Sequence, residues 1–214
     1  KKFEEVFPQA SEVEAYVQVD VVLKHGSHLS SGTLFGIQPD RQGHLWGFSD
    51  ALTEGSFVGL SERHTPLLSF DEVEKKWPGI ILGEGLGAQL GLNIGDELVV
   101  ISPQGATDSS SVMAGGTLSR TYVVIGTFVT NMFNFDSRWA VTNIPEARKF
   151  MTDYDRTLDS ENYVSGVAMN FKDPYVVNKV KTKLQNMGEL HGQSWMDTNK
   201  ALLFALLLEK FTMG

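Results

Sequence analysis

The sequence predicts an α+β fold in which both ends of the chain form one α/β unit and a β-rich middle segment is inserted between them. Three patterns lead to this prediction: two strand-like runs near the N-terminus, a middle third of strand-like runs with short helices, and a C-terminal strand–helix–strand pattern. The predicted bounds are 1–41 together with 158–214 for the α/β unit, and 42–157 for the inserted unit.

The N-terminal part predicts a hairpin. The run VEAYVQVDVVL, within Glu12 to Leu23, alternates in part between apolar and polar residues, and GTLFGIQPD, Gly32 to Asp40, ends in a proline turn. We expect these two strands to pair. From Arg41 to Pro66 the sequence is rich in Gly, Ser and polar residues, which indicates a connecting segment with short irregular elements.

The middle third begins with the clearest local pattern of the chain. GIILGEGLGAQLGLNIGDELVVIS predicts a strand at Ile80 to Leu82, a helix at Glu84 to Leu90, Gly91 just after the helix, and a tight turn at Gly95-Asp96 that leads into a strand. TYVVIGTFVT and SRWAVTNI then predict two more strands. PEARKFMTDY predicts a helix with Pro145 at its first position.

The C-terminal third predicts a βαβ unit. YVSGVAMNF is strand-like, DPYVVNKVKTKLQN is helical with Asp173 as N-cap and Pro174 in the first turn, and ELHGQSW is a returning strand. A terminal helix is expected from about Thr198 to Thr212. Its run ALLFALLL is apolar on every side, so it either docks on another part of the protein or marks a chain cut from a longer protein just before a membrane helix.

Composition narrows the class of protein. The chain has 214 residues, no cysteine, and a net charge of −8, with 42% hydrophobic and 21% charged residues. The acidic balance argues against nucleic acid or an anionic membrane surface as the main partner. The lack of cysteine excludes disulfides and thiolate chemistry but leaves the redox compartment open. The opening KKFEEVFPQA lacks the apolar stretch of a signal peptide, and the longest apolar run, ALLFALLL, is shorter than a membrane span.

Two short motifs and the possibility of a hydrolase site bear on whether the chain carries chemistry. His25 and His28 in HGSH could be a metal pair, but their spacing around Gly and Ser fits a hairpin turn and no third ligand is evident. GEGLG, Gly83 to Gly87, matches neither phosphate-loop spacing, so close packing of a short helix is the simpler interpretation. A hydrolase would need a nucleophile, a base and an orienting acid together, and no such cluster is evident. We expect no cofactor and no bound metal.

One loop is too long for a simple turn. Between LVVIS and TYVVIGTF lies a string of small polar residues and glycines with a single methionine, within Glu97 to Phe128. Connections of this length inside a compact domain are usually functional or disordered. A longer loop alone costs little closure entropy, so stability does not account for it.

Taken in order, three segments resemble one family. They are GIILGEGLGAQLGLNIGDELVVISP from Gly79, TYVVIGTFVTNMFNFDSRWAVTNIPEARKFM from Thr121, and WMDTNKALLFALLLEKFTMG from Trp195. Together they resemble the periplasmic domain of LolC/LolE-type permease subunits of lipoprotein-releasing ABC transporters, within the wider class of MacB-like mechanical ABC transporters. The resemblance covers most of the chain.

The resemblance implies a MacB-like periplasmic domain, with a Porter-like α/β subdomain built from both chain ends and an inserted Sabre-like subdomain. It implies a segment between the first and second membrane helices of a bacterial inner membrane protein. The implied partners are a sister or identical permease subunit, a separate cytoplasmic ATPase subunit, a soluble LolA-like lipoprotein carrier in the periplasm, and the lipoprotein cargo, with no nucleic acid. The domain itself would not be an enzyme.

The resemblance also assigns a role to the long loop. LolC-type members hold the carrier with a protruding hairpin, the hook, and with a polar patch that includes a Gln-Arg pair at the foot of the returning strand. The matching pair here is Ser119-Arg120, and Val99 stands where LolC carries another arginine on the outgoing strand. The predicted carrier-binding residues of the hook and its base are Gln104, Val112, Met113, Leu118, Ser119 and Arg120.

Other interpretations remain open at this point. Within the superfamily, the chain could be a MacB-like efflux permease domain that contacts an adaptor protein. The missing glutamine and the Gly/Ser content of the loop leave room for a different cargo system, or for a loop without a partner. From a different class, a stand-alone hydrolase would require clustered polar groups with shifted pKa values in an apolar pocket.

Overall fold

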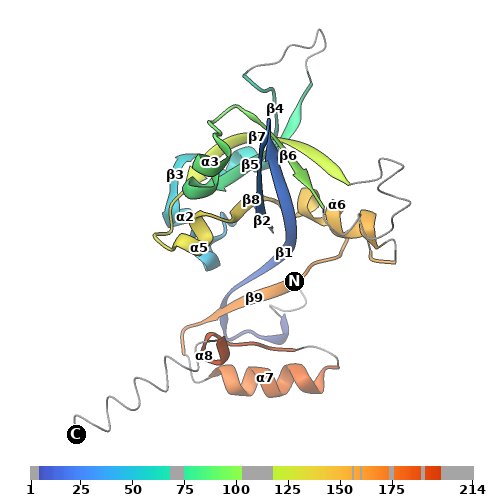
Figure 1. The fold of residues 1–214 in the computed structure, drawn as a ribbon. Coiled ribbons are helices and arrows are strands. Elements are labelled where there is room, and N and C mark those ends of the chain that lie inside the picture. The colour runs from blue at the N-terminus through green and yellow to red at the C-terminus, as the bar shows by residue number, and fades with distance from the viewer. Residues whose placement is uncertain are drawn as a thin grey trace, which may run out of the picture. The chain divides into compact units, whose positions relative to one another are not determined.

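The chain is seen in a computed structural model that describes residues 5–67, 75–102, 118–155, 157–159, 161–173, 176–188 and 191–198. Over these residues it combines a mixed sheet with short helices, which confirms the predicted α+β class (Figure 1). The described strands are β1 (Ala10–His25), β2 (His28–Ile37), β3 (Leu52–Gly55), β4 (Arg63–His64), β5 (Trp77–Gly83), β6 (Glu97–Ile101), β7 (Ser119–Phe128), β8 (Trp139–Asn143) and β9 (Gly166–Phe171). The described helices are η1 (His44–Trp46), α2 (Phe48–Ala51), η2 (Phe57–Ser61), α3 (Glu84–Leu90), α5 (Phe133–Asp136), α6 (Ile144–Tyr154), α7 (Val177–Asn186) and α8 (Trp195–Thr198).

The predicted N-terminal hairpin is confirmed. β1 and β2 pair antiparallel, with His25 opposite His28 at the turn. Gly26 adopts φ +55°, the left-handed conformation that glycine tolerates without strain, so the HGSH motif forms the turn as expected.

Six of the described strands close a ring. β1 pairs with β2 and β6, β2 with β8, β8 with β5, β5 with β7, and β7 with β6. The β2–β8 and β5–β7 pairs are parallel, and the other four pairs are antiparallel. β3 adds to β7, β4 to β5, and β9 to β1. Because every strand of the ring has a partner on both sides, none of the six is a free edge.

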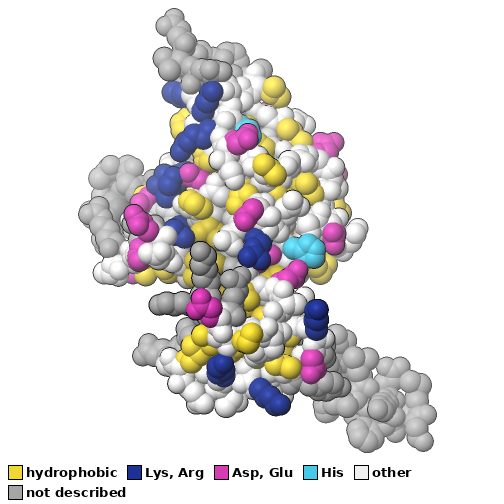
Figure 2. Space-filling view, turned by 180° about the vertical axis from the view of Figure 1, so that it is seen from behind, with side chains coloured by type: hydrophobic (Ala, Val, Ile, Leu, Met, Phe, Trp, Pro, Cys, Tyr) yellow, Lys and Arg dark blue, Asp and Glu magenta, His cyan; other side chains and the backbone are white. Residues whose placement is uncertain are grey.

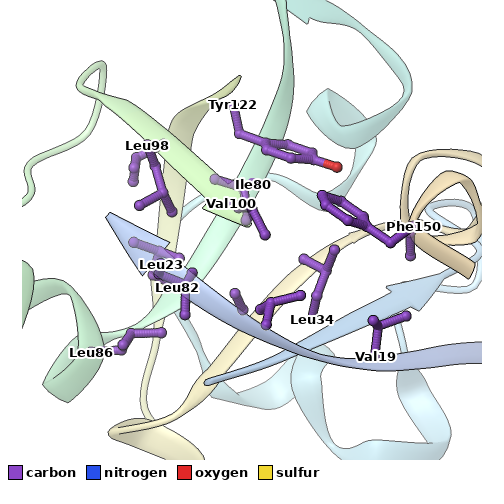
Figure 3. Close-up of a cluster of buried hydrophobic side chains, with 14 of the residues drawn as sticks. Val19, Leu23, Leu34, Ile80, Leu82, Leu86, Leu98, Val100, Tyr122 and Phe150 are labelled. Atoms are coloured by element: carbon purple, nitrogen blue, oxygen red, sulfur yellow. The ribbon is translucent and has the colours of Figure 1, made fainter. Parts of the chain in front are cut away.

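Alternation along the strands divides the apolar side chains of the ring between two clusters. Leu34, Ile80 and Ala140 point inward, whereas the next residues along the same strands, Phe35, Ile81 and Val141, point outward. The inner cluster also includes residues of α3 and α6; Figure 3 labels several of its side chains, among them Leu98, Val100, Tyr122 and Phe150. The outer cluster packs under α2 and η2 and includes Phe48, Phe57, Leu60 and Phe128.

The segment from β5 to β6 confirms the clearest sequence prediction. α3 ends at Leu90 with Gly91 at φ +63°, and Gly95 turns the chain into β6 at φ +95°. The GEGLG glycines allow close packing: a Cβ atom on Gly83 would lie 2.3 Å from the carbonyl oxygen of Asp136.

Two predicted helix starts need correction. α6 begins at Ile144, one residue before the predicted start, because the Asn143 side chain accepts a hydrogen bond from the Glu146 amide at 2.8 Å and so forms the N-cap. Pro145 is therefore the second helical residue. α7 begins at Val177 with Val176 at its N-cap position, so the prediction of Asp173 as N-cap was wrong.

The prediction of a return strand is also wrong for the part of that segment that the structure describes. Residues 191–194 form no strand, and the chain enters α8 at Trp195. Ser194 and Asp197 explain this, because the Ser194 amide and hydroxyl donate to the Asp197 carboxylate at 2.9 and 2.8 Å, which is a local helix-start arrangement. Apart from Thr198, the predicted terminal helix lies outside the described residues.

The chain divides into two compact units, residues 1–13 with 169–214 and residues 14–168. The smaller unit has its own apolar cluster around Phe7, Val180 and Leu184. The predicted bounds, 1–41 with 158–214 and 42–157, differ mainly at the hairpin. Most of the hairpin belongs to the larger unit because β2 pairs with β8 and β1 pairs with β6. None of the described helices is long and apolar enough to cross a membrane.

Candidate functional site

The predicted carrier-binding residues fall into two groups. Gln104, Val112 and Met113 lie outside the described residues. Leu118, Ser119 and Arg120 are described, and they lie where β7 begins.

β6 and β7 remain paired up to the last described residues on either side of 103–117. Ile101 lies opposite Ser119, and Val100 lies opposite Arg120. One residue further out, the Ser102 amide donates to the Leu118 carbonyl at 2.9 Å. The base is therefore a regular two-stranded extension of the ring and not a frayed loop end.

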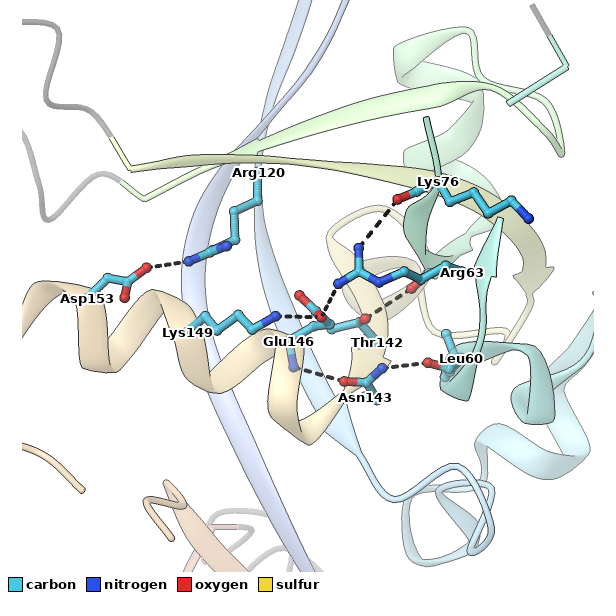
Figure 4. A network of polar contacts seen from close by, with 10 residues as sticks. Leu60, Arg63, Lys76, Arg120, Thr142, Asn143, Glu146, Lys149 and Asp153 are labelled. Carbon is cyan, nitrogen blue, oxygen red and sulfur yellow. Dashed lines mark hydrogen bonds and ion pairs between the residues drawn. The ribbon is translucent and has the colours of Figure 1, made fainter. Parts of the chain in front are cut away.

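Arg120 is held by contacts within its own chain. It donates a hydrogen bond and forms an ion pair with the Asp153 carboxylate of α6, and its guanidinium carbon lies 5.9 Å from the centre of the Phe150 ring (Figure 4). One third of the side chain, 33%, stays exposed. Partly exposed ion pairs of this kind contribute at most about 1 kcal/mol, so Asp153 orients Arg120 without removing it from reach of a partner.

Ser119 belongs to a different surface. It lines an open cavity of about 720 Å³ formed at the outer side of β1 and β6. The lining residues are Lys24, His25, Gly26, Pro66, Gly95, Asp96, Glu97, Val99, Ile101 and Ser119. The size lies within the range of ligand-binding pockets, and the wall combines apolar residues with one lysine and two carboxylates. Ser119 and Arg120 therefore face two different surfaces, because successive residues of a strand point to opposite sides of the sheet.

A polar network lies beside Arg120 (Figure 4). Glu146 of α6 is only 12% exposed and forms ion pairs with Lys149 at 2.7 Å and with Arg63 of β4 at 3.8 Å. Arg63 also donates to the carbonyl of Lys76 at 3.4 Å. Asn143 caps α6 and donates through its side-chain amide to the Leu60 carbonyl of η2. The network thus joins α6 to β4, η2 and the start of β5.

Tyr122 lies inside the ring, two residues after Arg120. It is fully buried, its ring stacks near that of Phe150 with centroids 6.5 Å apart, and its hydroxyl makes no hydrogen bond to a described residue. Burial raises the pKa of the Tyr122 hydroxyl strongly; the nearby Glu146 carboxylate raises this pKa further, and Arg120 lowers it. Tyr122 is therefore neutral at all ordinary pH values and acts as a packing residue.

The histidines of HGSH have structural roles. His25 Nδ1 lies 3.0 Å from the Leu90 carbonyl, which ties the hairpin end to α3. His28 is opposite it on β2 and exposed. Among the residues that the structure describes, no three His, Asp or Glu side chains come together as a metal site would require.

The sequence prediction missed the cations next to the base. Arg63 was assigned to an irregular connecting segment and Lys149 to an ordinary helix, so nothing brought them together. The sequence did contain a signal for the helix start: the N-I-P-E spacing at Asn143 matches a capping pattern in which an Asn and a Glu mark the beginning of a helix. The Arg63–Glu146 contact, which joins residues far apart in sequence, had no such signal.

Comparison with known proteins shows what the chain is similar to. No protein-family model matches the chain. The lipoprotein-releasing system transmembrane protein LolC of Neisseria meningitidis serogroup B is 26% identical over 201 residues, which cover 92% of this chain and 43% of that protein. This similarity confirms the resemblance to LolC that the three sequence segments predict. The chain spans less than half the length of that relative.

Solved structures with a similar arrangement are more distant. They are the extracellular domain of the noncanonic ABC-type transporter YknZ from Gram-positive bacteria (TM-score 0.47, 10% identity, 84% of this chain and 75% of that chain), the periplasmic region of MacB from Actinobacillus actinomycetemcomitans (TM-score 0.45, 15% identity, 86% and 71%), and a domain of a putative permease from Porphyromonas gingivalis (TM-score 0.40, 14% identity, 91% and 69%).

Proposed function

We propose that this chain is the periplasmic domain of an ABC transporter permease that helps release lipoproteins from the inner membrane and passes them to a soluble periplasmic carrier. The observation that carries the proposal is the similarity to LolC over 92% of the chain. The full permease would span the inner membrane and pair with a sister or identical subunit, and a separate cytoplasmic ATPase would supply the energy. This domain would contribute binding, without catalysis and without a cofactor.

The carrier would bind at the segment between β6 and β7 and at its base. Three features of the base support this role. The two strands remain paired up to Ser102 and Leu118, so the base is a firm support. Arg120 is oriented by Asp153 and the Phe150 ring while a third of it stays exposed. Ser119 opens onto a cavity of about 720 Å³ whose wall contains Val99 and Ile101.

The departures from the LolC pattern change the expected chemistry of the base. Where LolC-type members place polar groups, this chain has Val99 and Ser119, and both line the cavity. A carrier that fits here would place an apolar side chain against Val99 and Ile101 and keep its polar contact for Arg120. Met113 and Val112 are the proposed apolar contacts of the segment itself, because a flexible methionine suits an adaptable interface.

A capture experiment tests the proposal. The immobilised native domain is incubated with a periplasmic extract of the organism that encodes it, and bound proteins are identified by mass spectrometry. Three variants are compared with it: residues 104–118 replaced by an Asn-Gly turn, Arg120→Glu, and the matched control Arg138→Glu, an exposed arginine that follows α5. Melting curves check that each variant is folded.

The expected result is capture of a lipoprotein carrier by the native domain and by Arg138→Glu, with loss of capture in the other two variants. Capture of an efflux adaptor in place of a carrier would favour the MacB-like alternative. Equal capture of the carrier by all folded variants would show that the segment and Arg120 do not form the binding site.

A further inference from the structure

We propose that Met132 and Phe133, called here the apolar tip, insert into the surface of a phospholipid bilayer. The two residues lie where the chain enters α5. The inference goes beyond the proposed function, and it rests on that function in one respect, because a permease domain is held next to a bilayer. It assigns a lipid contact to a part of the larger unit that has no role in the proposed carrier site.

Both residues of the apolar tip are large, apolar and exposed to solvent. Phe133 is 81% exposed and Met132 is 52% exposed. Among the residues that the structure describes, they are the only two large exposed apolar residues that are neighbours in the sequence. On the face drawn in Figure 2, exposed hydrophobic side chains lie scattered among polar and charged ones, which is normal for a folded domain. Two such residues side by side at one tip call for a partner.

The backbone that carries the apolar tip is held by hydrogen bonds of its neighbours. The Asp136 carboxylate accepts hydrogen bonds from the amide and the hydroxyl of Thr130, both at 2.7 Å. The Met132 amide donates to the Thr130 hydroxyl oxygen at 3.2 Å, and Asn131 adopts φ +62° between them. Thr130 and Asp136 thus set the geometry of the turn, and the turn needs neither side chain of the apolar tip.

α5 itself is seated against the ring of strands. It contacts α3, β5 and β8 (Figure 1), and a Cβ atom on Gly85 would lie 3.1 Å from the Asp136 carbonyl oxygen. The Phe135 ring meets the Trp139 ring edge-on, with the ring centroids 4.4 Å apart. Phe135 therefore packs on protein, whereas Phe133 two residues earlier faces solvent. A tip on a backbone held in this way loses little conformational entropy when it binds.

The small size of the apolar tip favours a bilayer over a protein as its partner. A fully buried aromatic side chain covers about 150–250 Å², so the two side chains offer far less than the about 800 Å² per partner of a stable protein interface. Neither residue lines the cavity of about 720 Å³ described above. A bilayer requires no matching shape, because transfer of an apolar group from water into hydrocarbon is favourable whatever its outline.

The charges around the apolar tip favour neutral lipid over anionic lipid. Asn131 and Asn134 flank the tip, and both are exposed. Between β7 and β8 the one carboxylate, Asp136, is hydrogen-bonded, the one cation is Arg138, and the neighbouring helix α3 adds the exposed Glu84. The whole chain carries a net charge of −8, so attraction to anionic headgroups cannot drive the contact. The partner that fits is a zwitterionic phospholipid surface.

The test detects lipid contact with a fluorescent label beside the apolar tip. The chain has no cysteine, so Asn134→Cys provides a single attachment point for an environment-sensitive dye. The labelled chain is tethered through its C-terminus to phosphatidylcholine vesicles whose acyl chains carry a quencher. The main variant adds Met132→Ser and Phe133→Ser to the labelled chain. The matched control adds Leu29→Ser and Val58→Ser, which remove two exposed apolar side chains of β2 and η2 in the same unit. Melting curves check that every variant is folded.

We expect lipid to quench the label on the otherwise native chain. The ratio of docked to undocked molecules should fall at least about tenfold in the main variant and stay within about twofold in the control, because burial of one aromatic side chain alone is worth a factor of about ten or more. Raising the salt from about 50 mM to about 500 mM should leave the native ratio unchanged, because an apolar contact is not screened by ions.

Two results would overturn the lipid contact. One is a native chain whose label is not quenched, or is quenched equally in the main variant and the control. The other is self-association of the native chain in solution that Phe133→Ser abolishes, without quenching on vesicles, which would assign the apolar tip to a second copy of the chain. Neither result touches the proposed function, which the capture of a carrier decides. If capture fails and the vesicles quench the label as expected, the proposed function fails and the lipid contact stands.

Discussion

Replacing Tyr122 with phenylalanine should stabilise the protein, although most core substitutions destabilise. The Tyr122 hydroxyl is fully buried and makes no hydrogen bond to a described residue. A buried hydroxyl without a partner costs about 1–3 kcal/mol of desolvation, and phenylalanine keeps the ring and its stacking on Phe150. We expect the free energy of unfolding of Tyr122→Phe to rise by about 1 kcal/mol, which raises Tm by about 2–4 °C for a domain of this size.

Tyr122 also leads to a prediction about the stability of the folded protein at alkaline pH. Burial, aided by the Glu146 carboxylate, raises the pKa of Tyr122 in the folded protein far above its ordinary value of 10.0. The stability that comes from keeping this hydroxyl neutral is fully present below pH 10 and is lost as pH rises above it, because the unfolded chain then ionises its tyrosine first. At pH 11 the loss at this site is about 1.4 kcal/mol.

Urea unfolding of the native protein and of Tyr122→Phe, at pH 8 and pH 11, measures both effects. The advantage of the variant should grow by about 1.4 kcal/mol between the two pH values, since all other titrating groups are common to both proteins. Tyr122→Leu is the control for the ring and should cost about 2–4 kcal/mol through the cavity it leaves. A variant Tyr122→Phe that is less stable than the native protein by 1 kcal/mol or more, at both pH values, would refute the assignment of an unpaired hydroxyl.

Three further predictions use the same unfolding assay or simple binding measurements. Gly95→Val should destabilise by about 1–3 kcal/mol, because Gly95 has φ +95° and a Cβ atom there would lie 2.4 Å from the Leu67 side chain; an unchanged Tm would contradict the turn assignment. Asn143→Ala should cost about 1–2 kcal/mol by removing the N-cap of α6 and its hydrogen bond to Leu60, while Asn143→Asp, which keeps the acceptor for the Glu146 amide, should lose less; equal losses would show that the cap contributes nothing. The isolated domain should bind neither ATP nor a stoichiometric metal ion by calorimetry and elemental analysis, and micromolar ATP affinity would show that the Gly83 to Gly87 segment has been misinterpreted.

Local patterns predicted the elements whose structure is decided locally. The hairpin of β1 and β2 follows from alternation and from a glycine in the turn, and α3 with its following turn follows from glycines at positions of positive φ. The errors arose where tertiary contacts or capping groups compete with propensity. Ser194 and Asp197 start a helix where ELHGQSW was predicted as a strand, and the Asn143 cap places the start of α6 one residue earlier than predicted.

Long-range pairing had no signal in a single sequence. β2 and β8 lie side by side in parallel, with Thr33 opposite Trp139, although more than one hundred residues separate them. For the site, the strand was predicted from Thr121, and the family resemblance placed Ser119 and Arg120 at its foot; β7 in fact begins at Ser119, and alternation alone implies that the two residues face opposite sides. That Arg120 meets Asp153 and Phe150, and that Ser119 opens onto a cavity with Pro66, depends on how the ring closes.

The closed ring also determines how the domain responds to load. In the sequence, residues 103–117 connect β6 to β7, and each of these strands is bonded on both sides, β6 to β1 and β7, and β7 to β5 and β6. The ladder bonds between strands run across the strands, so tension along β6 and β7 shears many of them at once instead of opening them one after another. Because each of these strands has a partner on both sides, we expect tension along β6 and β7 to be shared with β1 and β5 before either strand separates from the ring.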